Sequence, residues 1–534
     1  MRNHEIFQEG IRLRPTKLVR QGELNEDVWN IFADNSRIPE LNWGDISAML
    51  SALKVGDRRI HGLIERHGLD AVQESMYRTL DNTEALTRQV LAEIPVGSYS
   101  FTEYFEDDYV SDLPVRIQVE LTVRDDGTVG LDFSGSDPQV RAAINLPTGG
   151  NRHHPFLCLG LVNFVVTHGH GLHYNGGIHR CIDLTMPEHS VVNSSYPAAC
   201  GMRFSTACRI QEAVLGALNK AVPQLVPAGG ADQSVITYIS TSELGKPGRV
   251  VVANPVQGGS GGGMNLDGES AVNLAAAFLR SVPVEVLEAE CPVTVHALRL
   301  RPDSEGAGRL RGGFGLEYAL QVHHPDAVFV MRGQDRHRFS GFGADGGQAG
   351  TTAKCTVAVE DGSLLDIGKD SVYGPGPADV IHFVSGGGGG QGPAVDREPQ
   401  SVADDFFDGL VSAERARDAY GVVVDQAGDV DTAATAAARA GMDARHGQFD
   451  YGPGRTGWEA RYGDVADRVA EWLPRLHPSV RRWAQASIYA HLDATADTVT
   501  GKEIDAAIAA VERGLQAFGP PGSTESLYLP NTAD

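Results

Sequence analysis

Clusters of glycine constrain the fold of this chain more than any other feature of its sequence. Glycine accounts for 63 of the 534 residues, and 14 of these glycines are gathered at residues 258–263, 312–315 and 386–392. Residues without a Cβ atom are used where a chain turns sharply or where a backbone must approach another group closely. We therefore expect these clusters to be turns between strands, or places where backbone amides meet a ligand.

Hydrophobic periodicity predicts the fold class. Apolar residues repeat at helical spacing between residues 40 and 95, whereas residues 115–123 alternate strictly between apolar and polar, and Asp126-Gly127 predicts a hairpin turn. A helix is expected at 204–222, a strand at 248–256, and short strands beyond residue 285. The pattern is that of an α+β, multi-domain protein with a mixed β-rich core, flanking helices and a C-terminal helical tail. We expect four regions: a helical region at 1–97, an α+β core at 98–403, a helical segment at 404–446, and an additional helical tail at 447–534.

The tail carries three of the five tryptophans, namely Trp458, Trp472 and Trp483. Thr500 and Glu503 have the spacing of a capping box ahead of a last helix. The tryptophans are expected either to build a small helical core of their own or to form a docking surface for a partner subunit.

Charge and composition exclude several classes of function. The net charge of −24 would repel nucleic-acid phosphates and anionic membranes, and no basic patch offsets it. The N-terminus is polar, and the longest apolar run, residues 156–166, is too short to span a bilayer. The six cysteines include no CxxC pair, so a disulfide framework or zinc knuckle is not indicated. We expect a cytoplasmic protein that binds neither nucleic acid nor membrane.

Two catalytic motifs occur without the structure that they need. GxSxG is matched around Ser260, but glycine and polar residues follow it where a nucleophile elbow requires a helix. GxGxxG is matched at Gly387, Gly389 and Gly392, but a proline follows. The sequence contains no GxxxxGK[ST], so the chain has no P-loop of its own.

Histidines are gathered in one glycine-rich stretch, at His168, His170 and His173. Such clusters can bind zinc or manganese. The stretch has no HExxH pattern, and its glycines indicate a loop. Polar loop histidines are therefore favoured over a metal site, and these three residues remain the weak metal-ligand candidates of the chain.

Seven phrases of the sequence form a set: IFQEGIRLRPTKLVRQGELNEDV (6–28), LDFSGSDPQVRAAIN (131–145), NSSYPAACG (193–201), PVEVLEAECP (283–292), LRPDSEGAGRLRGGFGL (300–316), SGGGGGQGP (385–393) and LVSAERARDAYGVVV (410–424). In this order they resemble the hydantoinase B and 5-oxoprolinase family, which includes larger subunits of acetone and acetophenone carboxylases. The resemblance extends from residue 5 to about 446, and residues 447–534 resemble nothing in that family.

The resemblance implies that the work is divided between subunits. A hydantoinase A-like partner with an actin-like ATPase fold would bind ATP and phosphorylate the substrate's oxygen. This chain would receive the activated small molecule, which then reacts with a metal-activated water or with carbon dioxide. The family's metal-ligand motifs precede the phrase that starts here at Gln8. We therefore expect the ATP on the partner, the divalent metal on another chain that supplies this missing segment, and no firmly expected cofactor on this chain.

The same phrases contain the candidate substrate-binding residues, which are Asp132, Ser134, Gly259, Gly261, Asp267, Arg309 and Arg311. Asp132 is expected to stabilise a turn or, alternatively, to contact substrate. Gly259 and Gly261 either bring backbone amides to a ligand or make a structural turn. The arginines are expected to pair with the Arg301-Pro-Asp303 phrase or, less readily, to bind phosphate. No catalytic residue is assigned.

The resemblance favours one function and leaves two others open. The first is a hydantoinase B-like subunit of a multi-subunit, ATP-dependent carboxylase of the acetone or acetophenone carboxylase type, acting on a phosphorylated ketone or enol. The alternatives are a subunit of an ATP-dependent amidohydrolase (a hydantoinase, 5-oxoprolinase or lactamase) and a non-catalytic structural or regulatory subunit of such a complex.

Overall fold

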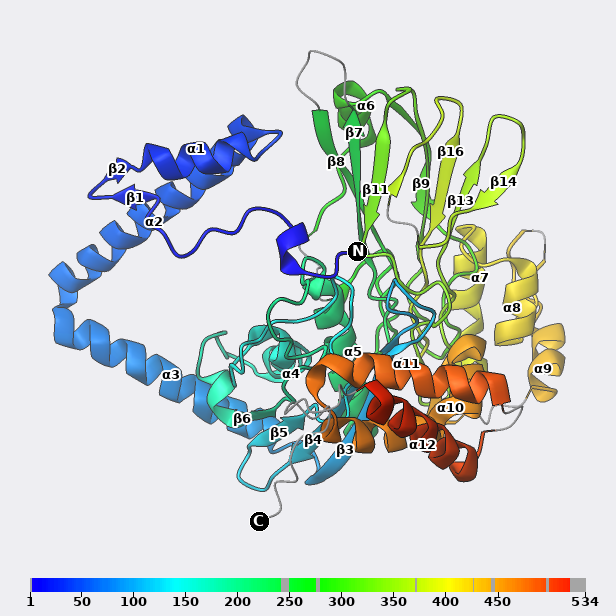
Figure 1. Ribbon diagram of the computed structural model, residues 1–534. Helices are drawn as coiled ribbons and strands as arrows, with labels where there is room; N and C mark the ends of the chain where they lie inside the picture. The colour runs from blue at the N-terminus through cyan, green and yellow to red at the C-terminus, as the bar shows by residue number, and fades with distance from the viewer. Residues whose placement is uncertain are drawn as a thin grey trace.

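The N-terminal part of the chain is a long arm that stands away from the rest of the protein (Figure 1). The computed structural model describes residues 2–241, 249–274, 279–369, 372–425, 427–442, 447–495 and 499–518. Its first elements are η1 (Ile6–Gln8), β1 (Val19–Arg20), β2 (Glu23–Leu24), α1 (Glu26–Asp34), α2 (Pro39–His67) and α3 (Leu69–Leu91). Gly68 has a φ of +81°, which L side chains rarely adopt, and it makes the bend between α2 and α3. The prediction of helices over 40–95 is confirmed.

The end of the arm leads into a four-stranded sheet. Its strands are ordered β3 (Gly97–Phe105), β4 (Val115–Val123), β5 (Val129–Asp132) and β6 (Ile182–Thr185). β3, β4 and β5 are antiparallel, and β6 runs parallel to β5. Every odd position of β4 is buried, and Gly127 has a φ of +72° between β4 and β5. The alternation and the hairpin predicted from the sequence are therefore confirmed.

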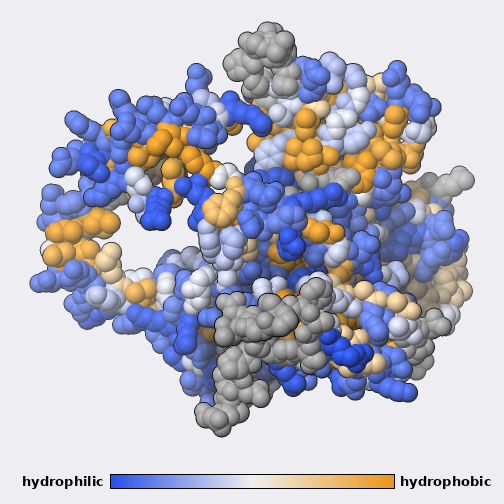
Figure 2. Space-filling model, in the orientation of Figure 1, coloured by the Kyte–Doolittle hydropathy of each residue, from blue (hydrophilic) through white to orange (hydrophobic). Residues whose placement is uncertain are grey.

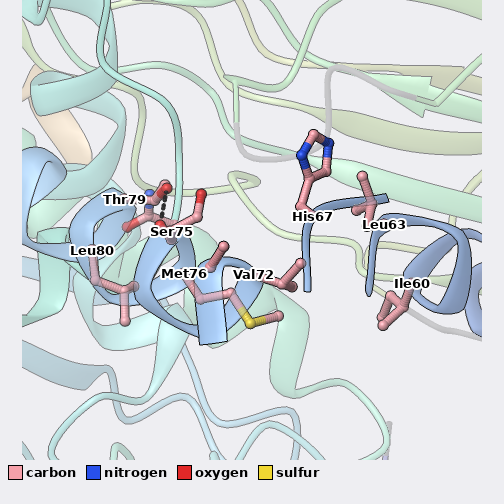
Figure 3. Close-up of a pocket in the computed structure, with 10 residues that line it drawn as sticks. Ile60, Leu63, His67, Val72, Ser75, Met76, Thr79 and Leu80 are labelled. Carbon is pink, nitrogen blue, oxygen red and sulfur yellow. Dashed lines mark hydrogen bonds between the residues drawn. The ribbon is translucent and has the colours of Figure 1, made fainter. Parts of the chain in front are cut away.

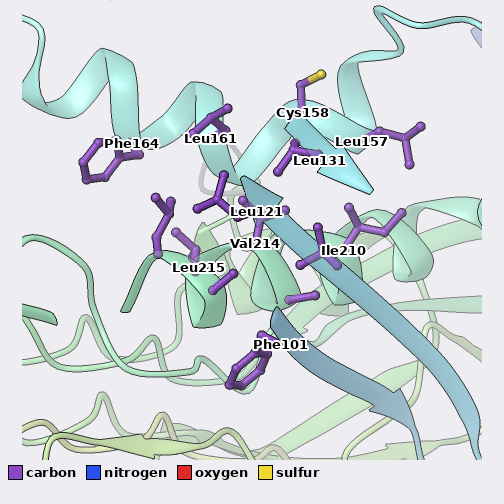
Figure 4. Packing of buried hydrophobic residues seen from close by; sticks show 14 of the residues in the cluster. Phe101, Leu121, Leu131, Leu157, Cys158, Leu161, Phe164, Ile210, Val214 and Leu215 are labelled. Atoms are coloured by element: carbon purple, nitrogen blue, oxygen red, sulfur yellow. The ribbon is translucent and has the colours of Figure 1, made fainter. Parts of the chain in front are cut away.

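Two buried helices pack against this sheet, α4 (Pro155–His168) and α5 (Arg203–Ala221). Figure 4 shows side chains of β3, β4 and β5 meeting those of α4 and α5, among them Phe101, Leu121 and Val214. α5 is buried without a break from Thr206 to Asn219, although that stretch includes charged residues. Because Lys, Arg, Asp and Glu are rarely buried without a partner, this helix is where polar interactions are expected.

Two further sheets share a second hydrophobic core. One has the order β14 (Leu364–Asp366), β13 (Lys354–Ala358), β16 (Val380–Val384), β10 (Leu316–Val322) and β9 (Val293–Leu300). The other has the order β15 (Val372–Tyr373), β11 (Val328–Arg332), β7 (Ser234–Thr241) and β8 (Arg249–Gln257). The short helix α6 (Val284–Glu290) contributes Leu287 to the same core. The β-rich stretch predicted beyond residue 285 is confirmed.

The glycine clusters lie together in the middle of the molecule rather than in separate turns. Segment 258–263 bonds through its backbone to segment 386–392 (Gly259 N to Gly386 O, 3.0 Å; Gly262 N to Gly389 O, 2.9 Å), and Gly388 N bonds to Gly313 O at 3.0 Å. A Cβ atom on Gly259, Gly312 or Gly388 would collide with the backbone of a neighbouring segment. Glycine is thus required at these positions because the backbones of the segments pack directly on one another. The expectation that the clusters are turns between strands is wrong.

Helices complete the C-terminal part of the chain. They are α7 (Pro399–Phe407), α8 (Ala413–Tyr420), α9 (Thr432–Ala440), α10 (Gly452–Trp472), α11 (Pro478–Thr495) and α12 (Gly501–Phe518). Short elements lie between the larger ones: η2 (Ile178–Cys181), η3 (Pro223–Leu225), β12 (Gly343–Ala344), η5 (Ala394–Asp396), β17 (Phe449–Asp450) and η6 (Leu473–Arg475). The Glu503 carboxylate accepts a hydrogen bond from the Thr500 backbone N–H before α12 begins, as the capping box predicts.

The last three helices form a small core of their own, which includes Trp472. Trp458 stacks on Tyr489 with ring centroids 5.4 Å apart. Two of the three tail tryptophans therefore pack internally, as the first of the two interpretations expects. Arg482 Nη2 bonds to Asp108 Oδ2 at 2.8 Å, and this ion pair joins the tail to the loop after β3.

No helix within the described ranges is both long enough and apolar enough to cross a bilayer. The six cysteines all lie within the described ranges, where they are buried and form no disulfide bond.

Candidate functional site

A cavity of about 420 Å³ lies where the first glycine cluster meets α4 and α5. Most of its wall is apolar, with Phe164 and Val166 from α4 and Leu215 from α5 among the lining residues. Four residues singled out in the sequence also line it, namely His168, Ser260, Gly261 and Asp267. A concave, mainly apolar cavity with a few converging polar groups is the usual form of a small-molecule site.

The polar groups at the inner side of the cavity leave one donor unused. The Gln211 side chain is completely buried, and its Oε1 accepts a hydrogen bond from Asn163 Nδ2 at 3.3 Å. Its Nε2 has no hydrogen-bond partner among the described residues. A buried amide donor without a partner costs about 1–3 kcal/mol, so a ligand that offers an acceptor here would recover that free energy.

Asp267 lies at the rim and is neutralised from outside the cavity. Arg397 donates to both of its oxygens (2.6 and 2.8 Å), and the backbone N–H of Arg311 donates to Oδ1 at 3.0 Å. Burial would raise the pKa of Asp267, but hydrogen bonding to Arg397 and the charges of Arg397 and Arg311 outweigh it and hold the pKa below its usual value. Asp267 is therefore a carboxylate fixed by structural contacts.

The arginines of the family-like phrases do not face the cavity. Arg311 makes bonds of 3.0–3.2 Å to both carboxylate oxygens of Asp405, and its guanidinium lies 4.5 Å from the ring centre of Phe314. Arg301 instead donates to the carbonyl oxygens of Thr352 and Ser385. The expectation that these arginines pair with the Arg301-Pro-Asp303 phrase is wrong. Arg311 pairs instead with Asp405, which lies 94 residues further along the chain.

The other arginine and aspartate candidates lie elsewhere. The Arg309 side chain is exposed. Asp132 Oδ1 accepts a hydrogen bond from the Ser134 backbone N–H at 2.8 Å, which closes the turn at the end of β5. Gly259 is enclosed by the carbonyls of neighbouring glycine segments and leaves no room for a ligand. Of the predicted substrate-binding residues, only Gly261 and Asp267 come together at the cavity.

The histidines do not form a cluster of metal donors. His168 Nε2 bonds to the backbone oxygen of Leu225 at 2.9 Å, and its ring packs on Phe164. His170 and His173 are exposed. Across the described ranges, no three His, Cys, Asp or Glu side chains are arranged so that they could hold a metal ion. The residues at this site therefore do not fit a resident metal.

Ser260 is held as a structural residue. Its side chain is 2% exposed, and its Oγ accepts a hydrogen bond from the Glu269 backbone N–H at 2.8 Å. The chain after it makes a tight turn at Met264 and Asn265, with no helix to aim a nucleophile. The sequence-based rejection of a nucleophile elbow is confirmed.

A pair of carboxyl groups lies behind the cavity wall. Glu212 follows Gln211 in α5, and its Oε2 accepts a hydrogen bond from the backbone N–H of Gly230 at 3.0 Å, two residues before Asp232. Both side chains are buried, and burial raises the pKa of each, for Glu212 together with the charge of Asp232. Two neighbouring buried carboxyl groups oppose each other's ionisation, which is why the pKa of Glu212 lies well above its usual value.

Arginines surround the neighbouring carboxylate of Glu103 on β3. Arg336 Nη1 lies 2.9 Å from it, Arg455 Nη1 3.4 Å and Arg209 Nη1 3.7 Å. These side chains come from α5, α10 and the loop after β11, so the charges connect three parts of the fold. Glu103 and these arginines consequently form a buried polar network with little freedom to move.

Sequence reasoning missed Gln211, Glu212 and Asp232. The available signal was the position of Gln211 and Glu212 among alanine, valine and leucine in the middle of a predicted helix. A polar pair on the buried side of a helix needs partners, but the partners follow later in the chain and carry no pattern of their own.

Taken together, the cavity suits a small neutral molecule with an apolar body and a hydrogen-bond acceptor. None of its described lining residues is lysine or arginine, and its rim carries the carboxylates of Asp267 and Glu269. A phosphate group would meet the carboxylate of Glu269 there, and the arginines that neutralise Asp267 are not among the lining residues that could pair with it.

Comparisons with known proteins agree with this architecture. Residues 1–394 match the profile of a family described as Hydantoinase B/oxoprolinase. The chain is 31% identical over 447 residues to caprolactamase subunit beta of Pseudomonas jessenii, covering 82% of this chain and 75% of that protein. The crystal structure of the ATP-dependent caprolactamase from the same organism matches with a TM-score of 0.73 at 30% identity, over 82% of this chain and 76% of that chain.

A second solved structure shares the fold more completely. Acetone carboxylase in its nucleotide-free form matches with a TM-score of 0.72 at 19% identity, over 98% of this chain and 73% of that chain. At this identity the likeness concerns the fold alone. The match over 98% of this chain therefore includes most of the described C-terminal helices, which lie beyond residue 394, where the family profile ends.

Proposed function

Because this chain belongs to the hydantoinase B/oxoprolinase family, we propose that it is the B-type subunit of an ATP-dependent carboxylase of the acetone or acetophenone carboxylase type, acting on a phosphorylated ketone or enol. A hydantoinase A-like partner binds ATP and transfers its terminal phosphoryl group to the ketone oxygen. The α-carbon gives up a proton as the enol phosphate forms. The water released when bicarbonate is dehydrated to carbon dioxide takes the phosphoryl group as phosphate, and the freed enolate carbon forms a bond to the carbon dioxide. ATP and bicarbonate are the co-reactants, and the products are a keto acid, ADP and phosphate.

The extent of the shared fold is the observation that favours a carboxylase. The acetone carboxylase fold extends over 98% of this chain, whereas the match to caprolactamase extends over 82%. The C-terminal helices are bound to the body by buried ion pairs, such as Arg455 with Glu103 at 3.4 Å. The C-terminal helices are therefore packed as part of the same folded body as the cavity.

In this proposal the cavity holds the ketone before it is phosphorylated. The unused Nε2 of Gln211 donates to the carbonyl oxygen, and the apolar wall accepts the rest of the molecule. The carboxylates at the rim disfavour the phosphorylated form, which would therefore be held by groups of the partner. Gln211 is the substrate-binding residue that this reading assigns, beside Gly261 and Asp267.

Cofactors are proposed to lie outside this chain. A divalent metal would polarise an oxygen or activate water where it is bound, but the donor groups described here do not fit one. ATP lies on the hydantoinase A-like partner, and another polypeptide segment supplies the metal ligands. We place the complex in the cytoplasm, where ATP is available and the six buried cysteines stay reduced.

An ATP-dependent amidohydrolase is the second candidate, because the sequence identity to caprolactamase subunit beta reaches 31%. In that case the cavity would hold a cyclic amide by its carbonyl oxygen, and water would attack the phosphorylated amide carbon. The third candidate, a non-catalytic subunit, is favoured by the absence of a metal-donor cluster among the described residues.

Reconstitution of the complex separates the three candidates. The chain would be co-purified with its hydantoinase A-like partner, and ATP consumption would be measured with small ketones and with lactams. A carboxylase incorporates labelled bicarbonate into an acid-stable product, whereas an amidohydrolase opens a lactam without bicarbonate. Lactam opening without bicarbonate fixation would overturn the carboxylase proposal. Full activity of a complex that lacks this chain would overturn both enzymatic candidates.

A further inference from the structure

The N-terminal arm has the surface of an interface. None of residues 2–82 is buried. Figure 2 shows apolar side chains gathered along the arm, with open space between much of the arm and the body. Each large apolar side chain left in water forgoes about 1.5–3 kcal/mol that burial would supply. An arm built in this way is expected to be covered in the assembled protein.

Five apolar residues of α2 follow one line along the helix. Ile46, Met49, Leu53, Ile60 and Leu63 are separated by three or four residues once the position of Gly56 is counted. Met49, Leu53, Ile60 and Leu63 are 59%, 70%, 46% and 48% exposed. We call this line the α2 stripe. Alternating steps of three and four place side chains on the seam that two packed helices share.

The α2 stripe continues into a hollow at the bend of the arm. A pocket of about 690 Å³ is lined by Ile60 and Leu63 of α2 and by Val72, Met76 and Leu80 of α3. In Figure 3 these side chains line the space where α2 turns into α3. A hollow of this size accepts bulky apolar side chains from another helix.

Charge divides α2 into two halves. Residues 39–53 contain two acids, Glu40 and Asp45, and no lysine or arginine. Residues 54–67 contain four bases and two acids, so the halves carry net charges of −2 and +2. A helix with this pattern is complementary to a copy of itself that runs antiparallel, and it repels a parallel copy. The helix macrodipoles favour the same orientation.

We propose that the arm is covered by the arm of a second copy of this chain, with the two α2 helices antiparallel about a two-fold axis near residues 54–55. Met49 then faces Ile60 of the second copy, Ile46 faces its Leu63, and Leu53 faces its Gly56. The absence of a side chain at Gly56 makes room for leucine at the centre. Asp45 of each copy lies beside Arg66 of the other, and the acidic half of one α2 closes the hollow of the other.

Pairing with a second copy explains why the surface of α2 is complementary to itself, which a different partner would not require. A two-fold axis needs the same surface on both molecules, and the α2 stripe matches itself in both spacing and charge. α2 is about 43 Å long at 1.5 Å per residue, so two copies can pair over their full length without involving the bodies. The catalytic bodies are thereby joined in pairs, independently of the hydantoinase A-like partner.

The oligomeric state of the full chain tests the proposal. Sedimentation equilibrium of the purified 57.0 kDa chain should give twice that mass. Leu53→Glu places a charge in the centre of the seam and should raise the dimer dissociation constant at least about tenfold, while circular dichroism stays unchanged. Phe407→Glu on α7 is the matched control, because Phe407 is 78% exposed outside the arm and its change should leave the dimer intact.

A charge exchange tests the antiparallel orientation separately from the apolar contact. Asp45→Arg should weaken the dimer, and the double variant Asp45→Arg with Arg66→Asp should restore it, since the two sites face each other only in an antiparallel pair. A full chain that stays monomeric at tens of micromolar would overturn the proposal. So would arm protection from hydrogen exchange that arises only when a hydantoinase A-like subunit is added. Single and double charge variants that behave alike would exclude the antiparallel register.

Discussion

The packing of the glycine segments makes a sharp prediction about one methyl group. A Cβ atom added at Gly262 would lie 2.5 Å from the carbonyl oxygen of Arg311 and 2.6 Å from that of Leu310. Real Cβ atoms essentially never approach a neighbour closer than 3.0 Å. The neighbouring segment must therefore move by several tenths of an ångström, and both obstructing atoms belong to backbone that cannot rotate away.

The cost of Gly262→Ala follows from two contributions. Overpacking of a filled core costs about 1–3 kcal/mol. Two backbone hydrogen bonds flank the position, from Gly262 N to Gly389 O and from Ala228 N to Gly262 O, both at 2.9 Å. Weakening them costs up to about 0.5–1.5 kcal/mol each. The sum is about 2–6 kcal/mol, a large part of the 5–15 kcal/mol that typically separates folded from unfolded protein.

Gly457→Ala is the matched control, because it makes the same chemical change in α10, where a new Cβ atom meets nothing within 4 Å. Alanine in a helix is favoured over glycine by about 0.5–1 kcal/mol, so this variant should melt slightly above the unchanged protein. Thermal unfolding followed by circular dichroism compares the two variants. A Gly262→Ala protein that melts with the unchanged chain would refute the idea that backbone contact requires these glycines.

Three further predictions concern the buried polar residues Gln211, Glu212 and Arg455. Gln211→Leu should raise the KM for a ketone substrate about tenfold, because it removes the amide donor that is unpaired in the free protein. It also removes the acceptor of the 3.3 Å hydrogen bond from Asn163, so the free energy of unfolding should fall by about 0.5–1.5 kcal/mol. Burial raises the pKa of Glu212 above 4.5, so the folded chain keeps a proton that the unfolded chain releases, and stability should fall as the pH rises above that value. Glu212→Gln should flatten this fall by about 1.4 kcal/mol for each unit of pKa difference, as melting curves between about pH 5 and 9 would measure. Arg455→Ala should destabilise the chain by about 1–3 kcal/mol in urea unfolding, because it removes a buried guanidinium that contacts Glu103 and donates to the backbone oxygen of Thr102, while Arg336 stays on Glu103. Arg461→Ala, which removes a surface ion pair, should cost no more than about 1 kcal/mol.

Local patterns predicted the elements of this fold well. The strict alternation of residues 115–123 became β4, and the helical spacing over 40–95 became α2 and α3. Such patterns suffice because side chains two, three or four residues apart share one face of a strand or helix. The same patterns do not say what each face meets. The exposed arm and the fully buried α5 were both expected simply as helices.

The candidate site could be predicted only in part for the same reason. Gly261 and Asp267 line the cavity, whereas Arg311 is paired with Asp405 and Gly259 is enclosed by other glycines. Nothing near Arg311 in the sequence indicates that a carboxylate on α7 will reach it. Pairing of charges depends on which segments pack together, and that is decided by contacts over long stretches of chain.

The sequence by itself determined the class of fold, the positions of most helices and strands, and the family, since these follow from short-range periodicity and from phrases in a fixed order. Only the tertiary structure decided what the glycine clusters do. Their lack of side chains permits both a turn and a close approach, and the choice depends on three segments, up to about 130 residues apart in the chain, meeting backbone to backbone. It also decided that Gln211, inconspicuous in the sequence, holds the free donor of the cavity.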